Sequence, residues 1–189
     1  MKKIYFFDFD GTISKTDSFV HFSFFSVSFF HALIYWLKVV VLYFFSSKAY
    51  LKETFFTHFS NVPINDFQVV CNKFYSRHIK ASIKKSFLDY INKKESKKIV
   101  IVSASINNYL SPWCTEMGFE LISTELEVID GRLTGKFSTL NCNGKEKVKR
   151  IKEKYNLLEY DEIHVFGNSK GDFPMLELGT HKYYKFFKS

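Results

Sequence analysis

The sequence predicts an α/β fold, a Rossmann-like parallel sheet covered by helices, and three observations carry this prediction. Short apolar runs typical of buried strands recur at residues 3–9, 98–102, 121–124 and 163–166. Helical patterns, such as residues 106–117 and 146–155, lie between them, and such alternation is typical of parallel sheets. Two alternating runs also flank Asp130-Gly131, which is a strong signal for a β-hairpin.

The segment between the first two strands is expected to form a separate helical unit. Residues 15–97 contain no clear parallel strand, so we expect a core of residues 1–14 plus 98–189 and an inserted helical cap of residues 15–97. Within it, Lys38 is the sole Lys, Arg, Asp or Glu of residues 18–47. Three readings stay open: a buried cap helix, a helix or hairpin at a membrane interface, and a membrane span. Because Lys38, His21 and His31 make a span costly, we expect the cap helix, with peripheral membrane contact through residues 19–45 as the close alternative.

Composition restricts the class of partner. The net charge of +8 favours anionic partners such as phosphate esters, an acidic membrane surface or nucleic acid. Since the basic residues are almost all lysine and no arginine cluster occurs, we expect no nucleic-acid binding. Cys71, Cys114 and Cys142 form no CxxC pair and are expected to be free thiols. Acids interrupt the apolar start of the chain, which argues against a secretory signal and for a cytoplasmic protein, with the inner face of the membrane as an alternative.

Two carboxylates end the first strand, in the stretch "IYFFDFDGTIS". Side chains alternate along a strand, so Asp8 and Asp10 should lie on one side. Two acids this close repel each other unless a cation or a shared proton lies between them. The stretch therefore suggests a metal or phosphate site, while an ordinary Asp-Gly turn remains the simpler alternative.

Polar residues follow three more predicted strands or begin the next helix. In "VSASINN", Ser103 or Ser105 could cap a helix and bind an anion there, although an ordinary helix cap explains them equally well. In "NGKEKVKR", Lys145 at a helix start opposes the helix dipole unless it faces a bound anion, whereas Lys147 and the later basic residues are expected to form a solvated face. In "GNSKGD", Asn168 and Asp172 offer oxygen ligands that suit Mg²⁺. Because ligands bind at the carboxyl ends of parallel strands, all four stretches are expected to meet in one site.

Taken in order, "DFDGT", "VSAS", "GKEK" and "GNSKGD" resemble the four motifs of the haloacid dehalogenase-like (HAD) superfamily of phosphohydrolases. The insertion after the first motif resembles the helical C1 cap of its phosphoserine phosphatase-like branch, and the finer pattern is similar to subfamily IB. That branch includes bacterial lipid phosphatases acting on phosphatidylglycerophosphate.

The resemblance implies a set of roles for residues of this chain. Asp8 would be the nucleophile that forms an aspartyl-phosphate, and Asp10 the acid and base. Ser103 and Lys145 would hold the phosphoryl oxygens. The implied Mg²⁺ ligands are Asp8, Asp10, Asn168 and Asp172. The implied substrate-binding residues are Thr12, Asp17, Ser103, Ala104 and Lys145.

Two of these positions are open to a second interpretation. Many relatives have Asp where this chain has Asn168, so the metal site would be weaker and Asp172 would carry more of the binding. Asp17 corresponds in spacing to an acid that recognises the substrate amino group in phosphoserine-specific relatives. In "TDSF" we instead favour Asp17 as the N-cap of a helix.

The leading hypothesis is a magnesium-dependent phosphomonoester hydrolase. Its Phe-rich cap favours a lipid or membrane-surface phosphate as substrate. The alternatives are a phosphatase of a small soluble ester such as phosphoserine, a signalling receiver domain and a membrane-binding relative that has lost catalysis. The long insertion and the distant Asp172 argue against a receiver domain.

Overall fold

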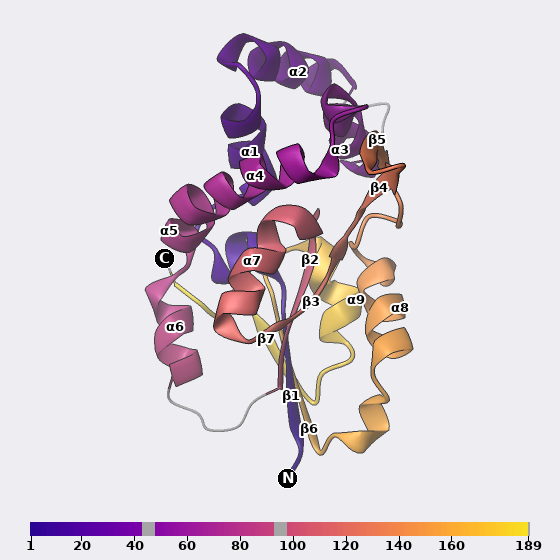
Figure 1. Ribbon diagram of the computed structural model, residues 1–189. Coiled ribbons are helices and arrows are strands. Elements are labelled where there is room, and N and C mark those ends of the chain that lie inside the picture. Colours follow the sequence, from indigo (N-terminus) through magenta and orange to yellow (C-terminus); the bar gives the residue numbers. More distant parts are fainter. Residues whose placement is uncertain (43–47, 93–97, 189) are drawn as a thin grey trace.

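A five-stranded parallel sheet organises the molecule (Figure 1). The computed structural model describes residues 1–42, 48–92 and 98–188. The strand order is β3-β2-β1-β6-β7, which places β1 at the centre. The strands are β1 (Lys3–Phe7), β2 (Lys98–Ile106), β3 (Glu120–Thr124), β6 (Glu162–Gly167) and β7 (His181–Tyr184). The predicted α/β fold is confirmed.

Alternation along β1 explains why the sheet is buried on both faces. Tyr5 and Phe7 enter one hydrophobic cluster, whereas Ile4 and Phe6 enter the other. On the first face lie α6 (Lys85–Asn92) and α7 (Asn107–Met117), and on the second lie α8 (Lys145–Lys154) and α9 (Phe173–Leu176). A strand with two covered faces needs apolar residues at every position, which is the run that the sequence shows.

Three element boundaries differ from the sequence prediction. β1 ends at Phe7 rather than at residue 9, because residues 9–13 turn through Gly11, whose φ of 74° is in the left-handed region. β2 continues to Ile106, so neither serine of "VSAS" caps α7. The short edge strand β7 was not predicted, since "HKYY" is neither apolar nor alternating.

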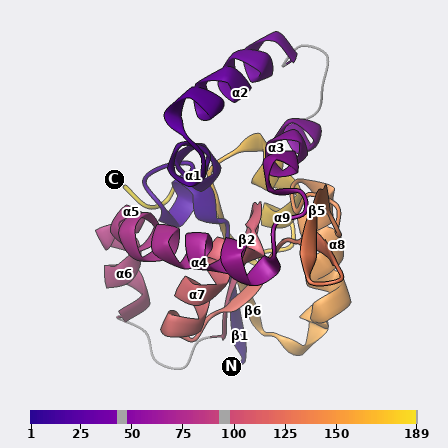
Figure 2. The ribbon, with the colours of Figure 1, turned by 45° about the horizontal axis from the view of Figure 1, so that its top comes forward.

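The described part of the inserted segment consists mainly of helices joined by short loops. Its helices are α1 (Ser18–Ser26), α2 (Phe29–Leu42), α3 (Lys48–Phe56), α4 (Ile64–Phe74) and α5 (Lys80–Ser82), followed by α6, which covers the sheet. Short 3₁₀ turns occur at Thr57–Phe59, Leu157–Glu159 and Lys170–Asp172, and short π turns occur at Phe9–Ile13 and Tyr75–Ile79. Figure 1 shows α1 to α4 beyond one end of the sheet, and α2 is outermost in both views (Figure 2).

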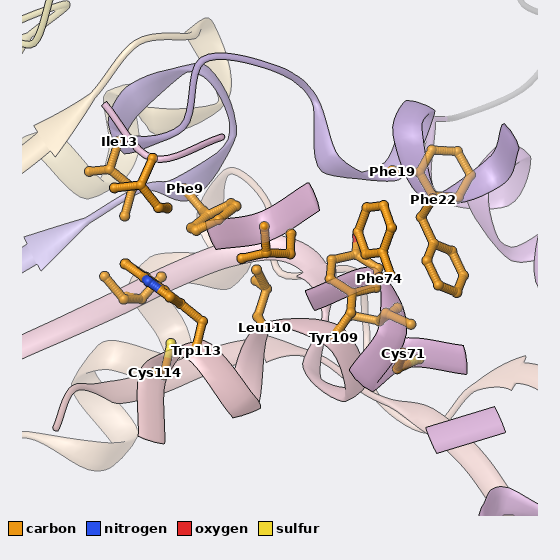
Figure 3. Packing of buried hydrophobic residues seen from close by; sticks show 14 of the residues in the cluster. Phe9, Ile13, Phe19, Phe22, Cys71, Phe74, Tyr109, Leu110, Trp113 and Cys114 are labelled. Atoms are coloured by element: carbon orange, nitrogen blue, oxygen red, sulfur yellow. The ribbon is translucent and has the colours of Figure 1, made fainter. Parts of the chain in front are cut away.

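The long apolar segment has two different environments. In α1, Phe19 and Phe22 are buried and belong to the same cluster as Tyr109 of α7, so that one core joins the insertion to the sheet domain (Figure 3). The prediction of a buried cap helix is therefore confirmed for α1. It does not hold for α2, which exposes Phe29, Phe30, Leu33, Ile34, Leu37, Val40 and Val41. No helix of the described residues is long and apolar enough to cross a membrane, and residues 43–45 of the predicted contact segment lie outside them.

The predicted hairpin is confirmed, and it forms backbone hydrogen bonds with the insertion. Its strands β4 (Leu126–Ile129) and β5 (Arg132–Phe137) turn at Asp130 and Gly131, both at positive φ. Leu133 exchanges backbone bonds with the loop before α4, accepting one from Asn61 at 2.7 Å and donating one to Val62 at 2.9 Å. Two linkers, around residues 13–15 and 82–84, connect the insertion to the sheet domain. They are joined by two backbone hydrogen bonds of 2.8 Å, from Lys15 N to Ser82 O and from Lys84 N to Ile13 O.

All three cysteines are buried free thiols, as expected. Burial raises the pKa of Cys114 to about 12 and that of Cys142 to about 11, and it also raises the pKa of Cys71. The thiolate is the reactive form, so the native chain should react with a disulfide reagent far more slowly than the chain in denaturant. The rate of thiol labelling, measured by absorbance with and without denaturant, tests this expectation. Fast labelling of the native chain would contradict the burial of these thiols.

Candidate active site

A cavity of about 550 Å³ opens at the carboxyl ends of the central strands. The core contributes residues from all four polar stretches, and the insertion contributes residues from the α1 entry and α3. The lining residues are Asp8, Asp10, Gly11, Lys15, Thr16, Asp17, Lys52, Ala104, Asn141, Asn143, Lys147, Asn168, Ser169, Lys170, Gly171 and Asp172. The predicted meeting of the four stretches at one edge of the sheet is therefore what the structure shows.

Asp8 lies at the end of β1 with both carboxylate oxygens held. Oδ1 accepts from Lys147 Nζ at 2.6 Å, and Oδ2 accepts from Thr12 Oγ1 at 2.7 Å. Its backbone N donates to Phe166 O at 3.0 Å, which fixes the strand end against β6. Burial raises the pKa of Asp8 to about 6, and Lys147 opposes this shift. The result is a fixed carboxylate with few solvent contacts.

Lys147 is the lysine that contacts Asp8 and Asp172, whereas Lys145 lies outside the cavity lining. The Lys147 side chain is 1% exposed, and Nζ lies 2.6 Å from Asp8 and 2.7 Å from Asp172. Lys145 is exposed at the first residue of α8 and is not among the residues that line the cavity. The inward face of α8 carries Lys147 and Ile151, four residues apart, so the solvated face expected for Lys147 is wrong. Burial acts to lower the pKa of Lys147, but the two carboxylates raise it above its usual range.

Asp172 has both oxygens occupied by the protein. Oδ1 accepts from Lys147, and Oδ2 accepts from Asn168 N, Ser169 N and Ser169 Oγ at 3.1, 3.0 and 2.8 Å. These bonds fold the glycine-containing loop after β6 around the carboxylate. Asn168 lines the cavity beside Gly11, where an added Cβ would lie 2.2 Å from the Asn168 amide nitrogen. Asn168 thus faces the cavity, and Asp172 fixes Lys147 and the loop.

Asp10 reaches the cavity from the turn after β1. Oδ1 accepts from Ser18 N at 2.7 Å, and Oδ2 accepts from Ser105 Oγ at 2.6 Å. Burial raises the pKa of Asp10 and Asp17 adds to this, while Lys52 and the two hydrogen bonds oppose it. A carboxyl group with a raised pKa can hold a proton at higher pH than an ordinary aspartate.

Three further residues expected in the site have different surroundings. Ser103 is buried, and its Oγ accepts from Ser105 N at 3.1 Å. Ala104 lines the cavity, but Ser103 does not. Thr12 is buried and faces Asp8 rather than the cavity.

The insertion places one acid, Asp17, and two lysines, Lys15 and Lys52, at the cavity. Asp17 caps α1 by accepting from Val20 N at 3.1 Å, as the cap reading expects, and it also lines the cavity. Lys52 of α3 lines the cavity, and its Nζ lies 5.3 Å from the centre of the Phe19 ring. No sequence signal distinguished Lys52, because its position depends on how α3 packs.

A buried lysine supports the turn that carries Asp10. Lys84 Nζ donates to Gly11 O at 2.8 Å and to Phe187 O at 3.2 Å. Burial lowers the pKa of Lys84. The turn is thereby joined to the second linker and to the C-terminal segment.

The donor set of the cavity fits Mg²⁺. Asp8 and Asp10 offer carboxylate oxygens and Asn168 offers an amide oxygen, which are the hard ligands that this ion prefers. Asp172 also lines the cavity, and its two oxygens accept bonds from Lys147 and from the loop after β6, just as both oxygens of Asp8 and of Asp10 accept bonds from their own neighbours.

The molecule has a parallel sheet, a carboxylate-lined cavity at the carboxyl edge of that sheet, and inserted helices that also line the cavity. This arrangement is typical of capped α/β enzymes. The chain belongs to the haloacid dehalogenase-like hydrolase family, whose model matches residues 5–177. The resemblance to this family drawn from the four motifs is confirmed.

Comparisons with individual proteins agree with this assignment. Protein CicA of Caulobacter vibrioides is 34% identical over 93 residues, which are 48% of this chain and 41% of CicA. A Bordetella pertussis protein described as of unknown function has a similar structure, with a TM-score of 0.86 at 19% identity over 95% of this chain and 88% of that one. A substrate-bound phosphoserine phosphatase is similar as well, with a TM-score of 0.63 at 17% identity over 95% and 83% of the two chains. These structures share the fold.

Proposed function

We propose that the chain is a magnesium-dependent phosphomonoester hydrolase that works through an aspartyl-phosphate on Asp8. The observation that carries this proposal is the buried Asp8 carboxylate, held by Lys147 and Thr12 at the edge of the cavity. Phosphoserine phosphatases among the structures of similar fold support the reaction class. The helices α1 to α4 would act as the cap.

The residues of the chain can carry out both halves of this reaction. Asp8 attacks phosphorus and the bond to the leaving oxygen breaks, while Asp10 gives that oxygen its proton. Asp10 then takes a proton from the water that hydrolyses the aspartyl-phosphate, which returns Asp8 and releases phosphate. Lys147 stabilises charge on the phosphoryl oxygens. Mg²⁺, held by Asp8, Asp10 and Asn168, would reduce the repulsion between phosphate and carboxylate.

Phosphate release across a panel of esters tests the proposed reaction. The panel includes p-nitrophenyl phosphate, phosphoserine and a lysophosphatidate, each with Mg²⁺ or with EDTA. We expect release with Mg²⁺, none with EDTA, and none from Asp8→Asn. Release that is equal in Asp8→Asn would contradict the assignment of the nucleophile.

The hydrogen bond from Ser105 to Asp10 predicts a pH effect. The Ser105 hydroxyl stabilises the charged carboxylate and so lowers the pKa of Asp10; without it that pKa rises. The protonated acid then persists to higher pH, so the alkaline limb of kcat for an alkyl phosphate should move upward in Ser105→Ala. The exposed Ser76→Ala is the control, and an unchanged or lowered limb would contradict Asp10 as the acid.

We further propose that the substrate is presented at a membrane surface. The support is the apolar face of α2, where Phe30, Val40 and Val41 are 74%, 65% and 69% exposed, together with the net charge of +8. Apolar side chains that lie open to water on one helix face favour an interfacial position.

Vesicle binding tests this finer proposal. In co-sedimentation with anionic phosphatidylglycerol vesicles, Leu37→Asp with Val41→Asp should bind about 30-fold more weakly, since two apolar contacts of about 1 kcal/mol each are lost. Turnover of p-nitrophenyl phosphate should not change. The matched control is Val69→Asp with Leu158→Asp, both exposed elsewhere. Equal binding by the two double variants would contradict membrane contact through α2.

A further inference from the structure

A second cavity lies beside the first, at the two linkers that join the insertion to the sheet. It has a volume of about 200 Å³. The first linker contributes Lys15 and Thr16, which line both cavities, and the second contributes Ala81 and Ser82. The two linkers are held together by the backbone bond from Lys15 N to Ser82 O, at 2.8 Å.

The charged groups around this cavity are all of one sign. Lys15 and Arg77 carry permanent positive charge, and His21 and His78 add two ionisable rings whose centres are 6.4 Å apart. Among the residues that the structure describes, no carboxylate lines the cavity, whereas four line the catalytic one. Hydroxyl groups of Thr16, Ser18 and Ser82 complete its polar lining.

The ring of His78 is packed against two aromatic side chains at this cavity. Its ring stacks on Phe74 at a centre-to-centre distance of 5.2 Å and makes an edge contact with Phe25 at 5.1 Å, and both contacts favour this ring position. Burial lowers the pKa of His78, and the neighbouring His21 and Arg77 lower it further. A bound anion would remove this repulsion, because it places negative charge among the four groups.

We propose that this cavity binds an anionic group the size of phosphate or sulfate, held by Lys15, His21, Arg77 and His78. The four side chains supply N–H donors suited to oxyanions, and Arg77 can bind in the bidentate manner typical of guanidinium groups. The anion is either free phosphate or a second acidic group of the substrate, since Lys15 and Thr16 connect the two cavities. The binding site does not depend on the proposed reaction; its use by the substrate does.

Sulfate titration of the full-length chain, followed by the ring C–H proton signals of its six histidines, tests the site directly. Signals are assigned by His21→Gln and His78→Gln. We expect sulfate to shift the His21 and His78 signals saturably. Arg77→Gln should raise the dissociation constant about tenfold or more, because a charge-assisted contact is lost. Lys73→Gln removes one exposed charge outside the cavity and should change nothing.

Two results would overturn the site. One is a uniform drift of all six histidine signals with ionic strength, and the other is an equal sulfate affinity in wild type, Arg77→Gln and Lys73→Gln. Because Arg77 is exposed, its substitution should leave the fold intact, which the unchanged remaining histidine signals would verify.

Kinetics separate the two sources of the anion. If the substrate supplies it, Arg77→Gln raises KM for a sugar bisphosphate and leaves KM for p-nitrophenyl phosphate unchanged. If free phosphate supplies it, Arg77→Gln leaves both KM values the same while the sulfate response of His21 and His78 still requires the higher sulfate concentration. Failure of the proposed function would instead appear as the absence of phosphate release in wild type, whatever the histidine signals do.

Discussion

Lys147→Met is expected to reduce phosphate release by about 100-fold or more, whereas Lys145→Met should leave it nearly unchanged. Lys147 is the buried cation beside Asp8, and removal of a donor that stabilises transition-state charge has an effect of this order. Lys145 is exposed at the start of α8 and offers a control of the same size, charge and helix.

The same pair of variants should differ in stability. Without Lys147, Asp8 and Asp172 are left as two buried carboxylates with no opposing charge, and breaking such an ion pair costs about 3–5 kcal/mol. In a chain of this length that lowers Tm by on the order of 10 °C, whereas Lys145→Met should shift it by no more than about 2 °C. Calorimetry in EDTA measures both, and equal Tm values would contradict the buried position of Lys147.

Asp8→Asn is expected to lower phosphate release by about 10⁴-fold or more, because an amide oxygen cannot replace the attacking carboxylate. Stability should respond in the opposite direction. The folded-state pKa of Asp8, about 6, lies above the usual value, so its ionised form destabilises the folded state as the pH rises through this range. Asn removes that cost, and Thr12 Oγ1 can still donate to the amide oxygen.

The resulting signature is a variant that is inactive but at least as stable as wild type above the pKa of Asp8. Thermal unfolding and phosphate release measured on the same preparations would show it. Asp161→Asn is a control, since Asp161 lies far from β1's carboxyl end and accepts from Lys2 N at 2.6 Å. Loss of both activity and stability in Asp8→Asn would mean that Asp8 is structural.

The sequence predicted the central strands because burial on both faces requires unbroken apolar runs. The same reasoning failed at β7, where "HKYY" forms an edge strand through its register with β6, with His181 opposite His164. For α2, nearly every residue is apolar, so the pattern could not show which face is packed. The structure buries Ala32 and Tyr35 and leaves Phe30 exposed.

The proximity of Asp8 and Asp10, the two acids proposed to be catalytic, could be predicted from their spacing, but the lysine of the site could not be chosen from its position at the helix start. The inward face of α8 is fixed by Ile151, and Lys147 precedes it by four residues. That spacing is visible in "KVKRI" and would have selected Lys147 over Lys145. Lys52 had no such signal, because it reaches the cavity only through the tertiary packing of α3.

The central claim, a phosphoryl group carried on Asp8, is tested most directly by trapping it in Asp10→Asn. With p-nitrophenyl phosphate the leaving group departs without a proton, so the first step should proceed while hydrolysis, which needs a base, is slow. After an acid quench, intact-mass and peptide analysis should show one phosphoryl group on the peptide that contains Asp8, and none when Asp8→Asn is added. A burst of nitrophenol without a labelled Asp8 peptide, or a label that persists in the double variant, would contradict the account.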